Sequence, residues 1–294
     1  MNVLTVCNGI GGFRVAADIA GLEVDRCYSS EINKDAIKVC DFNYPQDIPY
    51  KLGDITKWRG WDIDWSSIDL LVGGTPCQGL SRANSKRENL KDFRSVLFYT
   101  YVDILNHIKS VNPEVHFLLE NVKPDKETMS IMTEEIGVEP MIINSNLVSA
   151  QNRVRCYWFN WDVEQPEDRG ITIGDVIYDD DYKIFTDERI ERSKIPTKNY
   201  LKWDISGKGY YSQQDRAYYK TGKMCTVPKA TPANKLNIVL SEGVYRRSHP
   251  VEAERYQTLP DNYTSCITSP NKRIGLCGDG YTAEVIAHIL RGMK

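Results

Sequence analysis

The chain has 294 residues, a net charge of −3, 41% hydrophobic and 26% charged residues, as expected for a soluble globular protein of one large domain, or one large and one small domain. No apolar run approaches the roughly 20 residues of a membrane span, and the first residues enter a strand-like run, so we expect neither a membrane segment nor a signal peptide. Eight cysteines without a C-x-x-C pair and only four histidines argue against a zinc site and favour reduced thiols in an intracellular protein.

Positive charge is concentrated in two segments of the chain. Residues 189–247 hold 13 Lys and Arg against 4 Asp and Glu, and residues 82–94 hold 5 against 2. A basic region on an acidic protein is typical of a face that meets phosphates. An ordinary solvated surface is the alternative, which charge alone does not exclude.

The N-terminal segment has the pattern of a strand, a glycine turn and a helix. Residues 3–6 are strand-like, Cys7-Asn8-Gly9-Ile10-Gly11-Gly12 forms the turn, and residues 13–20 have helical spacing. Glycines let a ligand approach the backbone, and the start of a helix adds partial positive charge. The pattern predicts a nucleotide-binding crevice.

Two acidic residues follow at the ends of the next strands. A second strand at residues 26–31 ends in Glu31, about 20 residues past the turn, where nucleotide-binding folds place a carboxylate on ribose hydroxyls. The alternative for Glu31 is a neighbour of the helix N-cap, since residues 33–39 begin a helix. Asp54, in a third strand end at residues 51–56, could accept the exocyclic amine of an adenine or could be a turn residue.

A cysteine follows the fourth strand. The apolar residues 68–72 indicate a buried parallel strand that ends in Gly73-Gly74-Thr75-Pro76-Cys77, a sharp turn. Residues at the carboxyl end of a parallel strand face the ligand crevice of α/β proteins, so Cys77 is placed as a nucleophile would be. The alternative is a buried structural thiol. Residues 82–94, directly after it, are predicted to form an exposed loop.

The remaining strands add polar groups. A fifth strand at residues 115–119 runs into Glu120, and residues 140–143 and 145–148 are predicted to continue the sheet. In a strand at residues 151–159, alternation puts Gln151, Arg153 and Arg155 on one face. This face is predicted to be a pocket wall, and an edge strand with one solvated face is the alternative.

The composition changes after Trp161. The region to about residue 268 is rich in Lys, Tyr, Ser and Asn, which predicts a second, smaller domain. Residues 207–212 and 217–223 are expected to be exposed loops whose aromatic and basic side chains contact phosphates and bases. A short helix is predicted at residues 250–257, and an amphipathic helix at residues 281–290.

Taken in order, these motifs resemble those of the cytosine-C5 DNA methyltransferases over nearly the whole chain. They are, in chain order, Cys7 to Gly12 (the family's F-x-G-x-G-G cofactor turn), Glu31 (its ribose acid), residues 53–55 (its adenine-contacting tip), residues 73–78 (its Pro-Cys loop), residues 120–122 (E-N-V), Gln151, Arg153 and Arg155 (Q-x-R-x-R), residues 247–260 (the motif after the recognition domain) and residues 278–289 (the final helix). The compact size resembles that of bacterial or phage members. Two departures are Cys7, where the family has an aromatic residue that stacks on adenine, and Asp279, where it has asparagine; we expect Asp279 to point away from the cofactor.

The resemblance implies an α/β fold: a Rossmann-like class I methyltransferase sheet with a second, smaller, irregular target-recognition domain. It implies a catalytic and cofactor-binding domain at residues 1–165, a target-recognition domain at 166–268 and a C-terminal helix at 269–294 that returns to the catalytic domain. The implied cofactor is S-adenosyl-L-methionine, with no metal. The implied cofactor-binding residues are Cys7, Gly9, Gly11, Glu31, Ile32, Asp54, Ile55, Pro76 and Gly280.

The implied reaction methylates C5 of a flipped-out cytosine in a specific duplex DNA sequence. The thiolate of Cys77 would add to C6, protonated Glu120 would hydrogen-bond N3 and the exocyclic amine, and Arg155 would bind O2. Arg153 would hold the carboxylate and loop in place. Residues 226–238 are our hypothesis for the recognition loop.

Two other functional classes stay open. One is a tRNA cytosine-C5 methyltransferase of the same fold, although Gln78-Gly79-Leu80-Ser81 after the Pro-Cys resembles the DNA enzymes. The other is a non-catalytic family member that only binds DNA. For the DNA enzyme we expect double-stranded DNA as partner, a cognate restriction endonuclease acting separately as a further candidate, no membrane, a monomer, and a cytoplasmic location on nucleoid DNA of a bacterial cell or phage-infected host.

Overall fold

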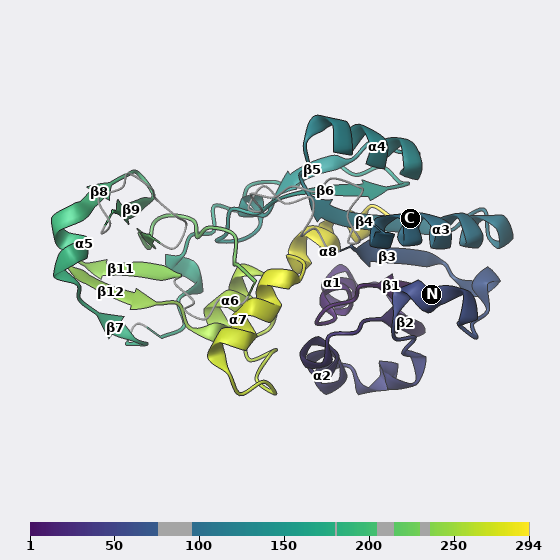
Figure 1. The fold of residues 1–294 in the computed structure, drawn as a ribbon, viewed down its shortest axis with the longest axis horizontal. Coiled ribbons are helices and arrows are strands. Elements are labelled where there is room, and N and C mark those ends of the chain that lie inside the picture. Colours follow the sequence, from purple (N-terminus) through teal and green to yellow (C-terminus); the bar gives the residue numbers. More distant parts are fainter. Residues whose placement is uncertain (76–95, 180, 205–214, 230–235, 294) are drawn as a thin grey trace. The chain divides into compact units, whose positions relative to one another are not determined.

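The chain divides into two compact units, which we describe separately (Figure 1). The computed structural model describes residues 1–75, 96–179, 181–204, 215–229 and 236–293. Unit 1 comprises Met1–Asn144, Val154–Gln165 and Val285–Lys294, and unit 2 comprises Ser145–Arg153 and Pro166–Glu284.

The sheet of unit 1 is mostly parallel. Its strands are β1 (Asn2–Val6), β2 (Arg26–Ser30), β3 (Leu70–Gly74), β4 (His116–Val122), β5 (Met141–Asn144) and β6 (Val154–Phe159), in the spatial order β2-β1-β3-β4-β6-β5. β2, β1, β3 and β4 pair in parallel, and β6 is antiparallel to both of its neighbours. This mixed α/β sheet, with helices between its parallel strands, confirms the predicted fold class.

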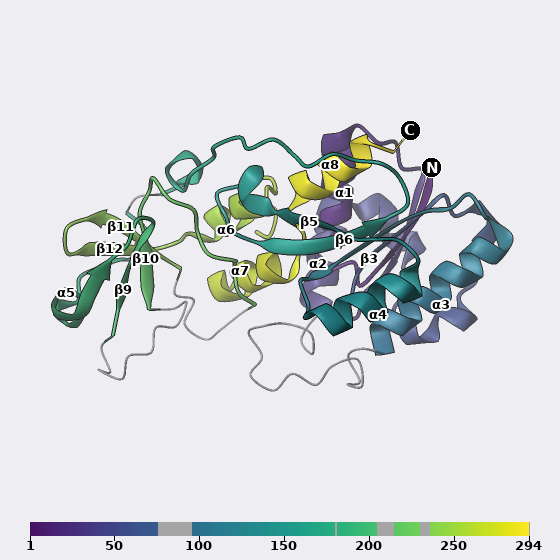
Figure 2. The same cartoon turned by 90° about the horizontal axis from the view of Figure 1, so that it is seen from above.

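Helices cover both faces of this sheet (Figure 2). They are α1 (Gly12–Ala20), α2 (Lys34–Asn43), α3 (Val96–Val111), α4 (Lys126–Ile136) and most of α8 (Ala283–Arg291), with 3₁₀ turns η1 (Pro45–Tyr50), η2 (Ile55–Gly60) and η3 (Trp65–Ser67). One core cluster joins alternate strand residues such as Leu71 and Leu119 to Tyr101 of α3 and Met132 of α4. Figure 2 shows α3 and α4 on one side of the strands and α1 and α8 on the other. Burial of apolar strand faces against helices on both sides is what stabilises such a sheet.

Unit 2 contains a second six-stranded sheet of short strands. Its elements are η5 (Ser145–Leu147), η6 (Gly174–Val176), β7 (Ile184–Phe185), α5 (Glu188–Ser193), β8 (Lys194–Pro196), β9 (Tyr200–Trp203), β10 (Arg216–Tyr218), β11 (Asn237–Ser241), β12 (Val244–Arg247), α6 (Pro250–Tyr256) and α7 (Pro270–Asp279). The strand order is β7-β12-β11-β10-β9-β8, with a parallel pair only at β10 and β11. A small core of Ile190, Leu201, Trp203, Ala217 and Tyr245 packs on one face.

The structural units and the predicted domains share the boundary after residue 165 and differ elsewhere. Residues 269–284, predicted to belong to the returning helix, group with unit 2 because α7 packs on α6. There, Arg273 Nη2 donates to Oε1 of the fully buried Glu254 at 2.8 Å. Residues 145–153 also belong to unit 2.

Several local predictions were wrong. Residues 145–148, predicted as strand, form the 3₁₀ turn η5, and the strand predicted at 151–159 begins only at Val154. The predicted exposed loop at 217–223 begins with β10, in which Ala217 and Tyr218 are buried because the strand lies inside the sheet, between β9 and β11. The predicted loops at 82–94 and 207–212 lie outside the described residues.

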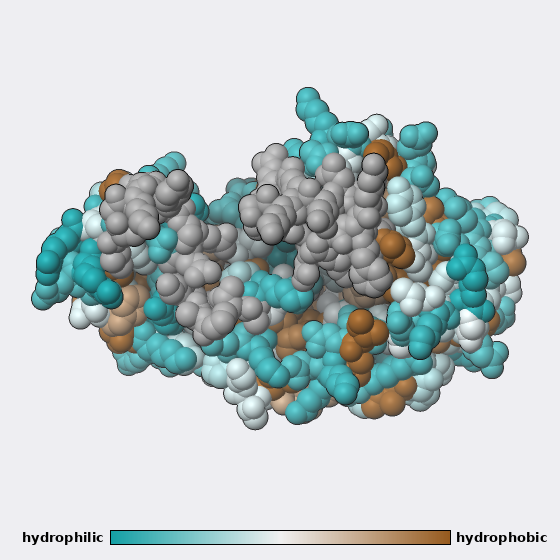
Figure 3. All heavy atoms as spheres, viewed as in Figure 1, coloured by the Kyte–Doolittle hydropathy of each residue, from teal (hydrophilic) through white to brown (hydrophobic). Residues whose placement is uncertain are grey.

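Hydrophilic residues cover most of the surface face drawn in Figure 3, where hydrophobic residues occur in small, separate groups. Among the described helices, none is both long and apolar enough to cross a membrane.

The fold generates a packing prediction at Gly73 in β3. A Cβ at this position would lie 2.6 Å from two ring carbons of Tyr101, whose side chain is fully buried. We expect Gly73→Ala to lower the free energy of unfolding by about 1–3 kcal/mol, the range for overpacked cores. Urea unfolding followed by tryptophan fluorescence would measure it. Gly60→Ala is the matched control, since no atom lies within 4 Å of its added Cβ; equal stability of the two variants would contradict the prediction.

Candidate active site

The glycine turn after β1 leaves open space beside the backbone. Gly9 and Gly11 have φ angles of 57° and 80°, in the left-handed region that favours glycine. A Cβ added to Gly9 would find no atom within 4 Å. Gly11 precedes the first turn of α1, so the amide groups at the start of that helix face this turn.

Glu31, at the end of β2, is held by three backbone N–H groups. Its Oε2 accepts from Gly9 N at 2.7 Å, and its Oε1 accepts from Ile32 N and Asn33 N, each at 2.8 Å. Asn33 is itself the N-cap of α2. The carboxylate therefore joins the glycine turn to the start of α2. Glu31 is a neighbour of the N-cap, as the alternative interpretation had it, and its proposed contact with ribose hydroxyls stays a prediction.

Cys7 lies between two carboxylates. Burial, together with the negative charges of Glu31 and Asp54, raises the pKa of its thiol to about 12. Cys7 also adopts a φ of 53°, unusual for a residue with a Cβ. Glu31 and Asp54, two other predicted cofactor residues, are thus close enough for their charges to act on the Cys7 thiol. The thiol is neutral at physiological pH.

Asp54 caps the 3₁₀ turn η2 rather than ending a strand. Its Oδ1 accepts from the Thr56 backbone N–H and hydroxyl, both at 2.9 Å, and these bonds lower the pKa of the carboxyl. Of the two predicted apolar cofactor residues, Ile55 is buried whereas Ile32 is 71% exposed. Ile32 offers apolar surface beside Glu31 that a ligand could cover.

Glu120 and Arg155 form an ion pair at the end of β4. Arg155 Nε lies 3.1 Å from Glu120 Oε1, with both side chains only about an eighth exposed (13% and 12%). Arg155 Nη1 also donates to the carbonyl of Val154 at 2.9 Å. Because β6 runs antiparallel to β4, it is the beginning of β6 that meets the end of β4, where Arg155 pairs with Val122.

A buried hydrogen bond fixes the end of β3 to β4. Asn121 Nδ2 donates to Thr75 Oγ1 at 3.0 Å, and Asn121 Oδ1 accepts from Val122 N at 2.8 Å. Both side chains are less than 5% exposed. Thr75 precedes Pro76 and Cys77, which lie outside the described residues. The sequence alone did not predict this pair, although Asn121 stands inside the E-N-V motif.

Gln151 and Arg153 are buried in unit 2, so the alternative of a solvated strand face was wrong for them. Gln151 Nε2 donates to Tyr256 O and Gln257 Oε1, and its Oε1 accepts from Val227 N. Arg153 donates to the carbonyls of Gly278 and Gly280, at 3.3 and 2.9 Å. Arg153 thereby anchors the turn that holds Gly280, and its catalytic role stays a prediction.

Asp279, in the same turn, forms an ion pair with Lys229, with Oδ2 and Nζ 3.2 Å apart. Asp279, which stands where the family has asparagine, thus has Lys229 as an ion-pair partner among the described residues of unit 2.

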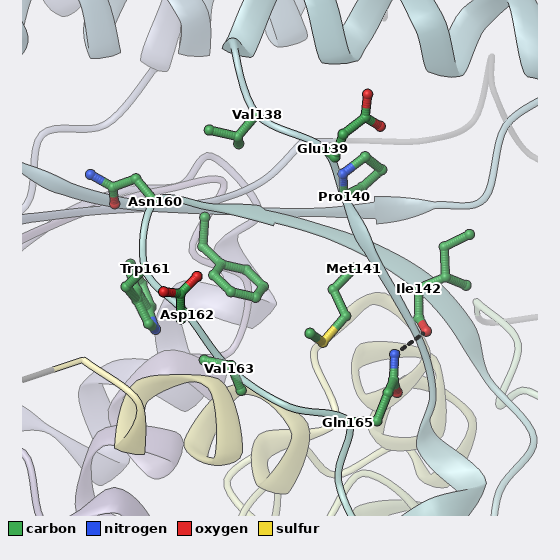
Figure 4. A pocket seen from close by; sticks show the side chains of 11 residues that line it. Val138, Glu139, Pro140, Met141, Ile142, Asn160, Trp161, Asp162, Val163 and Gln165 are labelled. Atoms are coloured by element: carbon green, nitrogen blue, oxygen red, sulfur yellow. Dashed lines mark hydrogen bonds between the residues drawn. The ribbon is translucent and has the colours of Figure 1, made fainter.

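A separate open cavity of about 780 Å³ lies in unit 1 between β5 and residues 159–165 (Figure 4). It is lined by Val138, Glu139, Pro140, Met141, Ile142, Phe159, Asn160, Trp161, Asp162, Val163 and Gln165. Figure 4 shows Gln165 donating to the Ile142 carbonyl, a bond of 3.0 Å. Of the predicted site residues that the structure describes, none lines this cavity. Among the described residues, no group of three or more His, Cys, Asp or Glu side chains is arranged to hold a metal ion.

Comparison with known proteins identifies the family. A family model described as C-5 cytosine-specific DNA methylase matches residues 1–165, more than half of the chain. The chain belongs to this family. The match covers unit 1 up to the end of Val154–Gln165 and therefore both the glycine turn and the Glu120–Arg155 pair.

Relatives of this chain occur in phages and bacteria. An orphan methyltransferase of Bacillus phage rho11s is 36% identical over 171 residues, which is 53% of this chain and 32% of the phage protein. The chain thus matches about a third of that relative's length. The type II methyltransferase M.NlaX of Neisseria lactamica is 27% identical over 99% of this chain and 96% of its own length.

Solved structures share the fold of this methylase family member. The Dnmt2 methyltransferase of S. pombe matches with a TM-score of 0.69 at 16% identity, over 99% of this chain and 97% of its own. A prophage-encoded DNA modification methyltransferase of E. coli, described as putative, matches with a TM-score of 0.61 at 18% identity, over 100% and 98%. At these identities the likeness concerns the fold.

The environment of Cys7 gives a reactivity prediction. With a pKa of about 12, roughly a thousandth or less of the Cys7 thiol is ionised at pH 8.5, whereas an unperturbed thiol is about half ionised. We expect iodoacetamide to label Cys7 in the native protein far more slowly than in urea-unfolded protein, with labelling measured by peptide mass spectrometry. Neutralising one charge, in Glu31→Gln, should increase the rate. Native labelling as fast as in urea would contradict the prediction.

Proposed function

We propose that this protein is a DNA cytosine-C5 methyltransferase, which transfers a methyl group from S-adenosyl-L-methionine to C5 of a flipped-out cytosine in a specific duplex sequence. The observation that carries the proposal is the Glu120–Arg155 ion pair at the end of β4, within the segment matched by the family model. Gly74, three residues before Cys77, pairs with Glu120 in the sheet, so the chain that leads to the proposed nucleophile leaves β3 beside this pair.

The residues around the glycine turn fit a nucleoside cofactor. Gly9 leaves open space, Glu31 supplies a hydrogen-bond acceptor and Ile32 supplies exposed apolar surface. All three residues lie where β1 and β2 end, at the same edge of the sheet. Asp54 uses Oδ1 for its capping bonds, which leaves Oδ2 as the proposed acceptor for an adenine amine. Cys7 replaces a stacking aromatic ring with a neutral thiol, so we propose weaker stacking on the adenine than in relatives.

The proposed catalytic residues act on the cytosine ring. The Cys77 thiolate adds to C6 and forms the S–C6 bond, which makes C5 electron-rich. Glu120, protonated when cytosine is bound, donates to N3 and accepts from the exocyclic amine, while Arg155 binds O2, so that negative charge does not build up on the ring. When bound, S-adenosyl-L-methionine would supply the electrophilic methyl group that C5 takes up, and would leave as S-adenosyl-L-homocysteine. A base then removes the C5 proton, and the S–C6 bond breaks to restore the ring and the Cys77 thiolate.

Recognition requires the duplex to open locally. The target carbons lie inside the stacked duplex, so the cytosine must be extruded, at a cost of a few kcal/mol. We propose that unit 2 reads the sequence around it from the major groove, and that residues 226–238, of which 230–235 lie outside the described residues, contribute the recognition loop. We further propose a monomer that acts on cytoplasmic nucleoid DNA in a bacterial or phage-infected cell. A cognate restriction endonuclease is one candidate partner.

Bisulfite sequencing tests the function and its residues together. The gene, carried on a plasmid in a methylation-free host, should protect cytosines of one short motif from conversion. Cys77→Ala should abolish protection, and Glu120→Gln should slow methyl transfer in vitro on the order of 10²- to 10⁴-fold, because it removes the proton donor to N3. The exposed Glu135→Gln on α4 is the matched control and should leave the rate unchanged.

The outcomes separate the functional classes. No protected motif, with methyl transfer to tRNA in a tritium assay, would replace the proposal with the tRNA enzyme. No transfer to either substrate, and no covalent adduct with 5-fluorocytosine DNA, would leave a binding protein. Protection that survives Cys77→Ala would disprove the proposed nucleophile.

Glu31 gives a separate prediction for the cofactor. Glu31→Gln removes the carboxylate charge and replaces one acceptor oxygen with an amide donor that faces backbone N–H groups. Hydrogen bonds to charged groups contribute about 1.5–3 kcal/mol, so we expect S-adenosyl-L-methionine to bind at least 10-fold more weakly by isothermal titration calorimetry. The exposed Glu23→Gln is the charge-matched control. Unchanged affinity for Glu31→Gln would remove Glu31 from the cofactor site.

A further inference from the structure

Unit 2 contains a cavity of about 250 Å³ whose lining is polar and aromatic. Side chains from β9 and β10 form one wall, Tyr200, Arg216 and Tyr218. The other walls include Asn152 and Thr226, which are tied together because Thr226 Oγ1 donates to the Asn152 carbonyl at 2.7 Å. We call this the Arg216 cavity.

Two cations face each other across the strands beside this cavity. In the antiparallel pairing of β9 and β10, Arg216 lies directly opposite Lys202, and Tyr218 lies opposite Tyr200. Directly opposite side chains share one face of a sheet, and like charges in that arrangement repel each other.

The guanidinium of Arg216 is held in position without a carboxylate. Its central carbon lies 4.9 Å from the centre of the Tyr200 ring, which restricts the orientation of the guanidinium plane. Within the described part of the chain, no Asp or Glu forms an ion pair with Arg216, and its buried Nε has no hydrogen-bond partner. A half-buried, oriented cation without a protein anion is suited to an anionic ligand.

The neighbouring groups supply further donors. The Tyr218 side chain is buried beside Arg216 and Cys225, and burial raises the pKa of Tyr218, so its hydroxyl stays protonated and able to donate. Asn152 and Asn199 also line the cavity. Lys223 adds positive charge, although its Nζ is engaged by the carbonyls of Asn146 and Ser149 at 2.7 and 3.2 Å.

We propose that the Arg216 cavity binds a phosphodiester group of the DNA backbone, with Arg216 as its charged donor. The proposal rests on the proposed function. A phosphate has the size and the acceptor oxygens to enter a recess lined with donors, whereas a base edge in the major groove is read by side chains that project into the groove. Arg216 also lies within the basic segment at residues 189–247. The contact would set the register of unit 2 on the duplex and carry no sequence information.

The salt dependence of DNA binding tests this contact. Fluorescence anisotropy would measure the Kd of the full chain for a duplex with the methylated motif and for a scrambled duplex, between 50 and 300 mM salt. Arg216→Gln should weaken binding to both duplexes by a similar factor, about 10-fold at low salt, and should reduce the slope of log K against log salt by about 0.9, the value for one phosphate. Arg216→Lys should keep the wild-type slope.

Arg192→Gln is the matched control. Arg192 is an exposed arginine of the same unit, paired with Glu188 in α5 through a contact of 2.7 Å. Its loss should leave the slope unchanged. If both arginine variants reduce the slope equally, the effect is general charge and the proposal fails.

Single methylphosphonates in the duplex give a readout that does not depend on the folding of a variant. At one backbone position, neutralising the phosphate should weaken wild-type binding about as much as Arg216→Gln does, and should have no further effect on that variant. If no backbone position behaves in this way, the proposal is overturned. It is also overturned if Arg216→Gln weakens binding only to the motif duplex and leaves the slope unchanged, because that result indicates base reading. If Arg216→Gln weakens binding to tRNA and not to duplex DNA, the proposal that the bound phosphodiester belongs to DNA is overturned. A wild-type protein that binds neither duplex would instead refute the proposed function.

Discussion

The parallel register of β1, β2, β3 and β4 is the constraint on which the candidate site depends. Val6 pairs with both Ser30 and Gly73, and Gly74 pairs with Glu120, so the four strands end at one edge of the sheet. The glycine turn, Glu31 and Thr75 follow these ends directly, and Glu120 lies near the end of β4. A slip of one residue in any pairing would turn the aligned side chains to the opposite face and separate the proposed cofactor and cytosine contacts.

The reversed strand β6 completes this edge in a different way. A parallel strand could contribute only its last residues there, whereas antiparallel β6 contributes its first, which brings Arg155 beside Glu120. The two carboxylates are also held by different means. Glu31 is fixed by backbone N–H groups of its own turn and of the glycine turn after β1, and Glu120 by a side chain that comes from a separate strand. The position of Glu120 therefore depends on long-range sheet pairing, and that of Glu31 on local chain geometry as well.

The sequence was sufficient to predict the mixed α/β fold, the glycine turn after β1 and the position of Glu31 after β2, because apolar runs, glycines and the spacing of acids depend on local pattern. It was insufficient for features created by distant contacts. The bond from Asn121 to Thr75 links residues 46 positions apart, and Lys223 donates to a carbonyl 77 positions earlier. Tyr218 was predicted to lie in an exposed loop for a related reason. Its segment is aromatic and basic, which is typical of a loop, and its burial results from the two neighbouring strands β9 and β11. Cys77 lies outside the described residues, so its role rests on sequence alone.

The division of the chain has a consequence for how such proteins diversify. Unit 2 is assembled from two stretches of sequence, because Ser145–Arg153 sits between β5 and β6 while the remainder follows Gln165. The two stretches are bonded to each other through Lys223 and through Asn152 N, which donates to Met224 O. A recombination event that exchanged only the longer stretch between two relatives would pack residues of one protein against Ser145–Arg153 of the other. A working exchange of unit 2 between relatives would therefore need both stretches to be inherited together, or compensating changes at Lys223 and its acceptors.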